Sequence, residues 1–322
     1  EKKSYQERLK NEVKHYKQIF KDNLLQPVPP VWSAVEAKFA EKLERVTGVR
    51  GLPEYIARHV KRKKKIKLLS LGSGACGVEL LIVAPLLEKQ GTKMELVSVD
   101  INDHILSSAR TEAQKRGINF QGIAQDINKL SLEENSYDVI MAFAALHHFE
   151  NLARVAKQIN KALKPGGVFV TVDIPTRNGY LMWEETKKLV DLVWKVLPAK
   201  YRWDHTFTKV PVLMNTYPDV DYSIGSMECA NSEAIMPALR KYLTEVDYVP
   251  ALSMARRFFD TKFGPNFNLH KPFDKALFEL LLMVDDLLVD GGVLKPETFF
   301  GAYVKKATTL RSPLQRVRRR KG

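Results

Sequence analysis

A strand, a glycine-rich turn and the start of a helix follow one another at residues 66–81, and an acidic residue, Asp100, ends the next strand. The turn reads Gly72-Ser73-Gly74-Ala75-Cys76-Gly77. Glycines let a backbone turn tightly against a ligand because no Cβ intervenes, and a carboxylate at Asp100 can accept hydrogen bonds from a ribose diol. This pattern predicts an α/β fold that holds a nucleoside.

Apolar strands alternate with amphipathic helices from residue 66 to residue 175. This alternation is typical of a parallel sheet with helices on both faces, so we expect a doubly wound, Rossmann-like domain. Lys164-Pro165-Gly166-Gly167 indicates the turn that leads into the last of these strands. The expected strands are 66–71, 94–99, 118–124, 137–143 and 167–173, and the expected helices are 77–89, 103–116 and 151–163.

The flanking segments differ from this core in composition and periodicity. We interpret residues 1–60 as a helical N-terminal extension and residues 61–175 as the nucleoside-binding core. Residues 176–246, which are rich in Trp, Tyr and Pro up to about residue 230, suggest an inserted cap over the substrate. Residues 247–308 are expected to close the sheet, with strands at 247–254 and 298–305, and residues 309–322 form a basic tail.

Composition excludes several classes of protein. The 322 residues are 45% hydrophobic and contain only two cysteines, Cys76 and Cys229, with no ligand-like spacing around them. A disulfide framework and a structural zinc site are therefore not expected. A reducing, cytoplasmic location is expected instead. No apolar run reaches the length of a membrane span. The oligomeric state is not predicted.

Positive charge gathers at two places, and the net charge is +14. The tail carries six basic residues, which favour a solvated extension, with contact to a membrane surface, nucleic acid or acidic polymer as the alternative. A second basic run, 61–65, precedes the first strand at the edge of the sheet opposite the expected ligand, so we interpret it as solvated.

The identity of the nucleoside depends on the motifs that follow. Gly72-x-Gly74-x-x-Gly77 matches the dinucleotide fingerprint and would by itself indicate NAD. The later strands, however, end in Ala124-Gln125-Asp126-Ile127 and in Phe143-Ala144-Ala145-Leu146-His147-His148. This series, in this order over about 66–175, resembles the class I S-adenosylmethionine-dependent methyltransferases. Residues 299–306 resemble the final antiparallel strand of that seven-stranded fold.

The resemblance implies a cofactor and the residues that hold it. S-adenosylmethionine would have its methionine part against the glycines, its ribose at Asp100, its adenine at Asp126 and Ile127, and its sulfonium near Phe143 and Ala144. Ser70 stands where the family often has an acidic residue. The full set implied to bind the cofactor is Ser70, Gly72, Ser73, Gly74, Gly77, Asp100, Ile101, Asp126, Ile127, Phe143 and Ala144.

Methyl transfer is a direct displacement that depends on positioning, with a base where the acceptor is a hydroxyl. His147 and His148, after the fourth expected strand, and Asp173, at the end of the fifth, are the candidate catalytic residues. Each could instead cap a helix, pack internally or bond a loop. No carboxylate cluster of the metal-dependent type is evident near the fourth strand, so no metal is expected.

The methyl acceptor is indicated by a resemblance in two short segments. Residues 183–202 and 231–239 resemble methyltransferases of bacterial glycan and polysaccharide synthesis, which implies O-methylation of a sugar or other small molecule. Tyr180, Trp183 and Trp203 would suit stacking on such a ligand. The alternatives are an RNA or other nucleic-acid methyltransferase, an NAD-dependent oxidoreductase, and a scaffold that binds cofactor without turnover.

Overall fold

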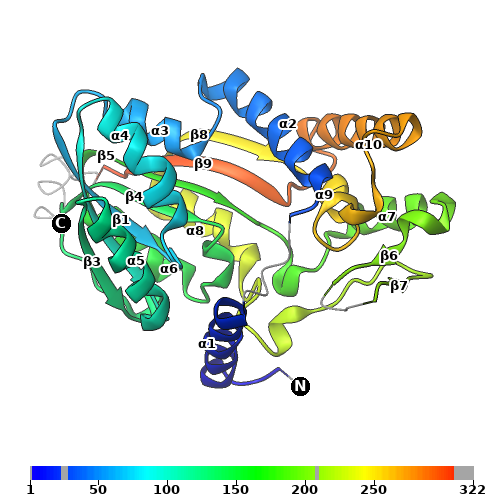
Figure 1. Ribbon diagram of the computed structural model, residues 1–322, viewed down its shortest axis with the longest axis horizontal. Helices are drawn as coiled ribbons and strands as arrows, with labels where there is room; N and C mark the ends of the chain where they lie inside the picture. Colours follow the sequence, from blue (N-terminus) through cyan, green and yellow to red (C-terminus); the bar gives the residue numbers. More distant parts are fainter. Residues whose placement is uncertain (1, 23–27, 207–209, 308–322) are drawn as a thin grey trace, which may run out of the picture.

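A seven-stranded sheet forms the centre of the molecule (Figure 1). The computed structural model describes residues 2–22, 28–206 and 210–307 of the chain. The strand order is β3-β2-β1-β4-β5-β9-β8. These strands are β1 (Lys65–Leu71), β2 (Lys93–Asp100), β3 (Asn119–Ala124), β4 (Tyr137–Phe143), β5 (Leu163–Asp173), β8 (Leu243–Ala251) and β9 (Thr298–Lys305).

The first five strands are parallel, and β9 runs antiparallel between β5 and β8. Strand β1 pairs with both β2 and β4, so the strand order reverses direction beside it. Open α/β sheets bind ligands at the carboxyl ends of the strands beside such a reversal. The predicted doubly wound, seven-stranded fold is therefore confirmed, including the antiparallel strand at 298–305.

Helices cover both faces of the sheet and extend to one side of it (Figure 1). The expected helix at 77–89 begins with a π-helical turn, Glu79–Val83, before it continues as α4. The helices are α1 (Tyr5–Asp22), α2 (Pro30–Thr47), α3 (Leu52–His59), α4 (Ala84–Lys89), α5 (Asp103–Lys115), α6 (Leu152–Ala162), α7 (Glu184–Val196), α8 (Ile235–Tyr242), α9 (Met254–Phe259) and α10 (Pro272–Asp290).

Successive residues of each strand point to opposite faces, and this alternation makes two hydrophobic cores. On one face Ile140 and Phe169 pack with residues of α6 and α8. On the other face the neighbouring Val139 and Val170 pack with residues of α3, α4 and α5. The central strands are buried on both faces, which accounts for their nearly continuous apolar sequences.

A third hydrophobic core lies beside the sheet and contains buried residues of α2, α7, α9 and α10. Trp194 of α7 packs edge to face against Phe263, with ring centroids 4.9 Å apart. This third core, called the cap below, therefore combines three stretches that the sequence suggested separately: the N-terminal extension, the insertion and the C-terminal part. A small sheet of β6 (Trp203–Asp204) and β7 (Val212–Leu213) extends it. Helix α8 falls within the expected cap at 176–246 but packs on the sheet instead.

The N-terminal extension does not form one body. Helix α2 joins the cap and α3 packs on the sheet, whereas α1 lies apart from both (Figure 1). None of the described helices is long and apolar enough to cross a membrane. The basic tail at 309–322 lies outside the described residues.

Candidate cofactor and acceptor site

A cavity with about 980 Å³ of empty space, including its mouth, lies at the carboxyl ends of β1, β2 and β4. Three residues that the resemblance implied, Ser70, Gly77 and Phe143, are not part of its lining. The other eight line it together: Gly72, Ser73, Gly74, Asp100, Ile101, Asp126, Ile127 and Ala144.

The glycine turn brings backbone close to the cavity. Gly72 has φ +68°, and a Cβ there would lie 2.8 Å from Cβ of Ala145, so the segment after β4 packs directly on this turn. Gly74 has φ +52°, and nothing lies within 4 Å of where its Cβ would be. The backbone at Gly74 thus borders open space that a ligand can occupy.

Asp100 fixes the turn from the end of β2. Its Oδ2 accepts a hydrogen bond from the Gly74 amide and its Oδ1 accepts one from the Asn102 amide, both at 2.9 Å. Burial raises the pKa of Asp100, and these amides offset only part of that effect. Asn102 also lines the cavity, and its buried Nδ2 has no hydrogen-bond partner among the described residues. The cavity thus offers a carboxylate acceptor and an unused amide donor, which fits a nucleoside.

Helix α1 supplies part of the cavity wall, through Leu9, Val13 and Tyr16. Its first residue, Tyr5, donates a hydrogen bond of 2.7 Å to Oδ2 of Asp126. Burial and this hydrogen bond raise the pKa of the Tyr5 hydroxyl. The sequence suggested only an accessory helix here, and no local motif marks these residues as part of a site.

The three implied residues outside the lining have other surroundings. Ser70 is buried and donates a hydrogen bond to the carboxyl group of Glu79, whose pKa is raised by burial. Phe143 is at the end of β4 and is 44% exposed. Gly77 follows the turn, with open space around its Cβ position.

His147 and Asp173 form a buried pair after β4 and β5. The Nδ1 atom of His147 lies 2.7 Å from Oδ1 of Asp173. Asp173 also accepts backbone hydrogen bonds, among them those from Ala145 and Leu146 at 2.9 and 2.7 Å. Burial alone would raise the pKa of Asp173, but His147 and these amides outweigh it and hold the pKa below its usual value. Asp173 is therefore an ionised carboxylate whose oxygens orient the loop and the imidazole.

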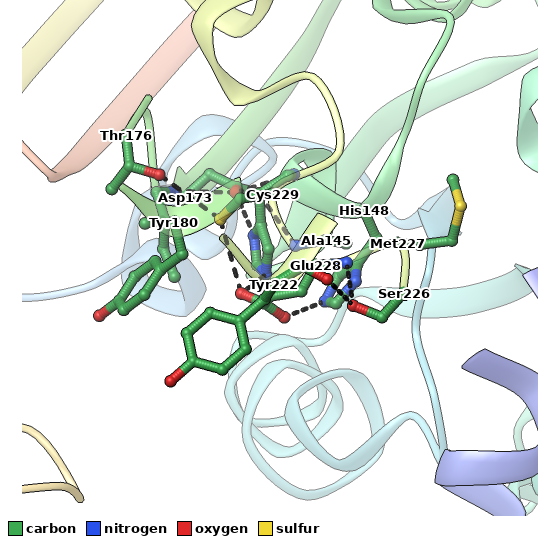
Figure 2. A network of polar contacts seen from close by, with 12 residues as sticks. Ala145, His148, Asp173, Thr176, Tyr180, Tyr222, Ser226, Met227, Glu228 and Cys229 are labelled. Carbon is green, nitrogen blue, oxygen red and sulfur yellow. Dashed lines mark hydrogen bonds and ion pairs between the residues drawn. The ribbon is translucent and has the colours of Figure 1, made fainter. Parts of the chain in front are cut away.

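His148 lies between two further carboxylates, one of which appears with it in Figure 2. Its Nδ1 is 2.8 Å from Oε1 of Glu12 on α1, and its Nε2 is 3.8 Å from Oε2 of Glu228. Burial by itself would lower the pKa of His148, but Glu12 and Glu228 raise it to about 9. Glu12 and Glu228 were not among the residues inferred from the sequence.

A second cavity adjoins the first, and the two share Glu12 and Tyr16 in their linings. It has about 1540 Å³ of empty space, including its mouth. Tyr180 lines it, with a strained φ of +66°, whereas Trp183 and Trp203 do not. Charged and aromatic residues predominate around it, including Glu12, His15, Tyr16, Trp32, Tyr180, Tyr222, Glu228, Arg256, Asp260 and Lys262.

Part of the chain is similar to known methyltransferases. The profile of a family described as "Methyltransferase domain" matches residues 62–210. A sterol 4-C-methyltransferase of Caenorhabditis elegans is 29% identical over 147 residues, which are 45% of this chain and 42% of that protein. A ubiquinone/menaquinone biosynthesis C-methyltransferase of a Shewanella species is 32% identical over 111 residues, 34% of this chain and 43% of its own length.

Among solved structures, a putative sarcosine dimethylglycine methyltransferase from Galdieria sulphuraria is similar at 16% identity, with a TM-score of 0.46 over 79% of this chain and 83% of that one. The chain spans less than half the length of the two curated relatives. The profile match covers β1 to β5 with the glycine turn, Asp100 and Asp126. Residues 62–210, just under half of the chain, are therefore a methyltransferase domain, and the seven-stranded sheet that contains them has the fold of the class I S-adenosylmethionine-dependent enzymes.

Proposed function

We propose that this protein transfers a methyl group from S-adenosylmethionine to a hydroxyl of a sugar or another polar small molecule. The observation that carries the proposal is the pair of adjoining cavities. One has the acceptor and donor groups that suit a nucleoside, and the other has a charged and aromatic lining. Because Glu12 and Tyr16 line both, two ligands bound there would lie next to each other.

In this proposal the first cavity holds the cofactor. Asp100 accepts hydrogen bonds from the ribose hydroxyls, and Asp126 and Ile127 lie against the adenine. The Gly72–Gly74 turn holds the methionine part, with Ser73 beside it, and Ala144 borders the sulfonium. When bound, S-adenosylmethionine supplies an electrophilic methyl group, so that the new O–C bond forms as the S–C bond breaks and the hydroxyl proton passes to Nε2 of His147.

His147, His148 and Asp173 are proposed to prepare the acceptor hydroxyl. A carboxylate cannot donate a hydrogen bond, so the Asp173 contact fixes the proton of His147 on Nδ1 and leaves Nε2 as an acceptor. Asp173 is thus a positioning residue that orients His147. Glu228 approaches both imidazoles and also lines the second cavity, which connects the two histidines with the acceptor.

The lining of the second cavity favours a polar acceptor over an apolar one. The names of the two curated relatives refer to C-methylation of sterols and quinones. Here Arg256 donates a hydrogen bond of 3.0 Å to the Tyr180 hydroxyl, and Asp260 and Lys262 lie along the same cavity. Aromatic faces beside charged groups suit the apolar face and the hydroxyls of a sugar, so a glycan or sugar acceptor remains our proposal. Both cysteines are free and buried, and a cytoplasmic location stays a prediction.

The decisive experiment is a calorimetric titration with S-adenosylhomocysteine, with NAD in parallel. We expect micromolar binding of S-adenosylhomocysteine that is lost in Asp100→Ala and kept in Asp103→Asn, which changes an exposed acid on the next helix. Acceptor screening then follows by mass spectrometry, starting with sugars. Binding of NAD without S-adenosylhomocysteine, or S-adenosylhomocysteine binding that survives Asp100→Ala, would overturn the assignment of this cavity.

A further inference from the structure

Two imidazoles and a carboxylate converge at the wall between the two cavities. His147 and His148 are consecutive on the short 3-10 turn that follows β4. Glu228 comes from the loop before α8, far away in the sequence. Its Oε1 lies 3.9 Å from Nε2 of His147, and its Oε2 lies 3.8 Å from Nε2 of His148. One ligand atom of each residue lies within 4.8 Å of the others.

Both imidazoles are held from behind by a second carboxylate. Nδ1 of His147 contacts Asp173 at 2.7 Å, and Nδ1 of His148 contacts Glu12 at 2.8 Å. A carboxylate at Nδ1 fixes the ring orientation and makes Nε2 the atom that faces a metal; at His148 the hydroxyl of Tyr16 also lies 3.5 Å from Nε2. This arrangement is characteristic of metal-binding histidines, and here it occurs twice.

The cluster of His147, His148 and Glu228 lies between the two cavities. His148 lines the first cavity and Glu228 lines the second. The side chain of His147 is 5% exposed, that of His148 is 19% exposed and that of Glu228 is 33% exposed. The cluster is therefore enclosed by protein on the imidazole side and is reached by a ligand past Glu228, from the acceptor cavity.

We propose that His147, His148 and Glu228 bind a divalent first-row transition-metal ion, which coordinates an oxygen of the methyl acceptor. Two imidazoles with one carboxylate suit Zn²⁺, Fe²⁺ or Co²⁺, whereas Mg²⁺ and Ca²⁺ prefer oxygen ligands alone. A metal lowers the pKa of a coordinated hydroxyl, so with the ion on Nε2 of both histidines the hydroxyl would lose its proton to water rather than to an imidazole before it attacks the methyl carbon. This role of the ion rests on the proposed function, but the binding of the ion does not.

The competing reading is a purely structural network. Glu12 accepts a hydrogen bond of 3.2 Å from the Met227 amide, so the same acids also hold α1 and the 226–230 loop together. In that case the three residues form no metal site, and Glu228→Gln changes the stability of the protein only. The two readings therefore differ in a quantity that can be measured without a methyl acceptor.

The test uses the full chain, freed of metal by a chelator and titrated with Co²⁺ alone. We expect one equivalent to bind with the visible absorption of nitrogen- and oxygen-coordinated Co²⁺, and Zn²⁺ to displace it. Glu228→Gln and His148→Gln should each abolish the saturable change. Glu134→Gln and His104→Gln, which alter exposed residues elsewhere, should leave it intact. Circular dichroism of each variant verifies that it is folded.

Absence of a saturable one-to-one Co²⁺ site, or equal Co²⁺ binding by folded Glu228→Gln, would overturn the metal site. Methyl transfer at an unchanged rate in chelator-treated protein would overturn the role of the ion in the reaction. Co²⁺ binding in a protein that fails to bind S-adenosylhomocysteine would support the metal site and contradict the proposed function. The two proposals can therefore fail separately.

Discussion

The hydroxyl of Tyr5 donates a hydrogen bond of 2.7 Å to the carboxylate of Asp126, and so joins helix α1 to the loop after β3. The other carboxylate oxygen of Asp126 accepts from the Asn128 amide at 2.9 Å. Leu9 and Val13, one and two turns further along α1, line the same cavity. Helix α1 therefore covers the cavity, and its contact with Asp126 lies where the adenine is proposed to bind.

Tyr5→Phe should weaken binding of S-adenosylhomocysteine because it removes one hydrogen bond that holds α1 over the ligand. A hydrogen bond to a charged group contributes about 1.5–3 kcal/mol, so we expect a loss of about tenfold or more in affinity, mainly through faster dissociation. Stopped-flow fluorescence and calorimetry measure both. Tyr242→Phe on α8 is the matched control. Tighter binding in Tyr5→Phe would mean that Tyr5 competes with the ligand for Asp126.

Gly72→Ala and Gly91→Ala separate backbone strain from crowding. Both glycines have positive φ, +68° and +77°, and alanine pays about 1–2 kcal/mol in that region. Only at Gly72 would the new Cβ meet another atom, at 2.8 Å from Cβ of Ala145. Overpacking adds roughly 1–3 kcal/mol there.

We therefore expect urea unfolding to show a larger loss of stability for Gly72→Ala than for Gly91→Ala. Gly72→Ala should also lose affinity for S-adenosylhomocysteine, because the turn it distorts forms the cavity wall. Equal losses of stability would mean that Ala145 moves aside without cost.

The arrangement of the sheet and much of the cofactor cavity could be predicted from the sequence because both follow from local patterns. The carboxyl ends of parallel strands meet at one edge, so Asp100, the last residue of β2, and Asp126, two residues after β3, had to lie near the glycine turn. Ser70 precedes the turn at a similar position, yet its side chain points to Glu79 in the protein interior. For a side chain as small as serine, its position on the strand does not decide whether it points to the cavity or to the protein interior.

The contributions of Glu12 and Glu228 could not be predicted in the same way. Both come from segments outside the sheet, and their approach to His148 depends on how α1 and the 226–230 loop dock. Docking of this kind leaves no periodic pattern in the sequence. The expectation that no metal binds followed from the spacing around the cysteines and from the lack of a carboxylate cluster near the fourth strand. Neither pattern includes a carboxylate from a distant loop such as Glu228, whose Oε2 lies 3.8 Å from Nε2 of His148.

Arg257 and Glu297 form a fully buried bidentate ion pair at the base of the cap, with contacts of 2.6 and 2.9 Å. Arg257 also donates a hydrogen bond to the backbone oxygen of Tyr180, a residue of the acceptor cavity. Removal of one partner of such a pair costs about 3–5 kcal/mol because the other charge stays buried.

Arg257→Leu should therefore be strongly destabilised in urea, and the double variant Arg257→Leu/Glu297→Leu should recover part of the loss. Arg240→Leu, which breaks an exposed pair with Glu245, is the control and should change stability by less than about 1 kcal/mol. If the double variant were as unstable as the sum of the two single variants, the ion pair would not be the source of the effect.

Asp285 on α10 should make the stability of the protein fall with rising pH. Burial, with smaller contributions from the charges of Glu297 and Asp286, raises the pKa of Asp285 to about 7, although the amides of Ser253 and Ala255 donate hydrogen bonds to it and lower the pKa. A carboxyl group whose pKa is higher in the folded than in the unfolded state binds its proton more tightly when folded. Its contribution to stability is thus complete below about pH 4 and is lost as the pH rises to about 7.

The loss is of the order of 4 kcal/mol, from about three pKa units at 1.36 kcal/mol each. Asp285→Asn cannot ionise, so its free energy of unfolding should decline less between pH 4.5 and pH 7.5 than that of the unaltered protein. Urea unfolding across this range measures the difference, with Glu279→Gln on the exposed side of the same helix as the control. Because other groups titrate in both proteins, only the difference between the two curves reports on Asp285. Parallel curves would mean that Asp285 stays ionised in the folded protein, stabilised by the hydrogen bonds that the two amides donate to it.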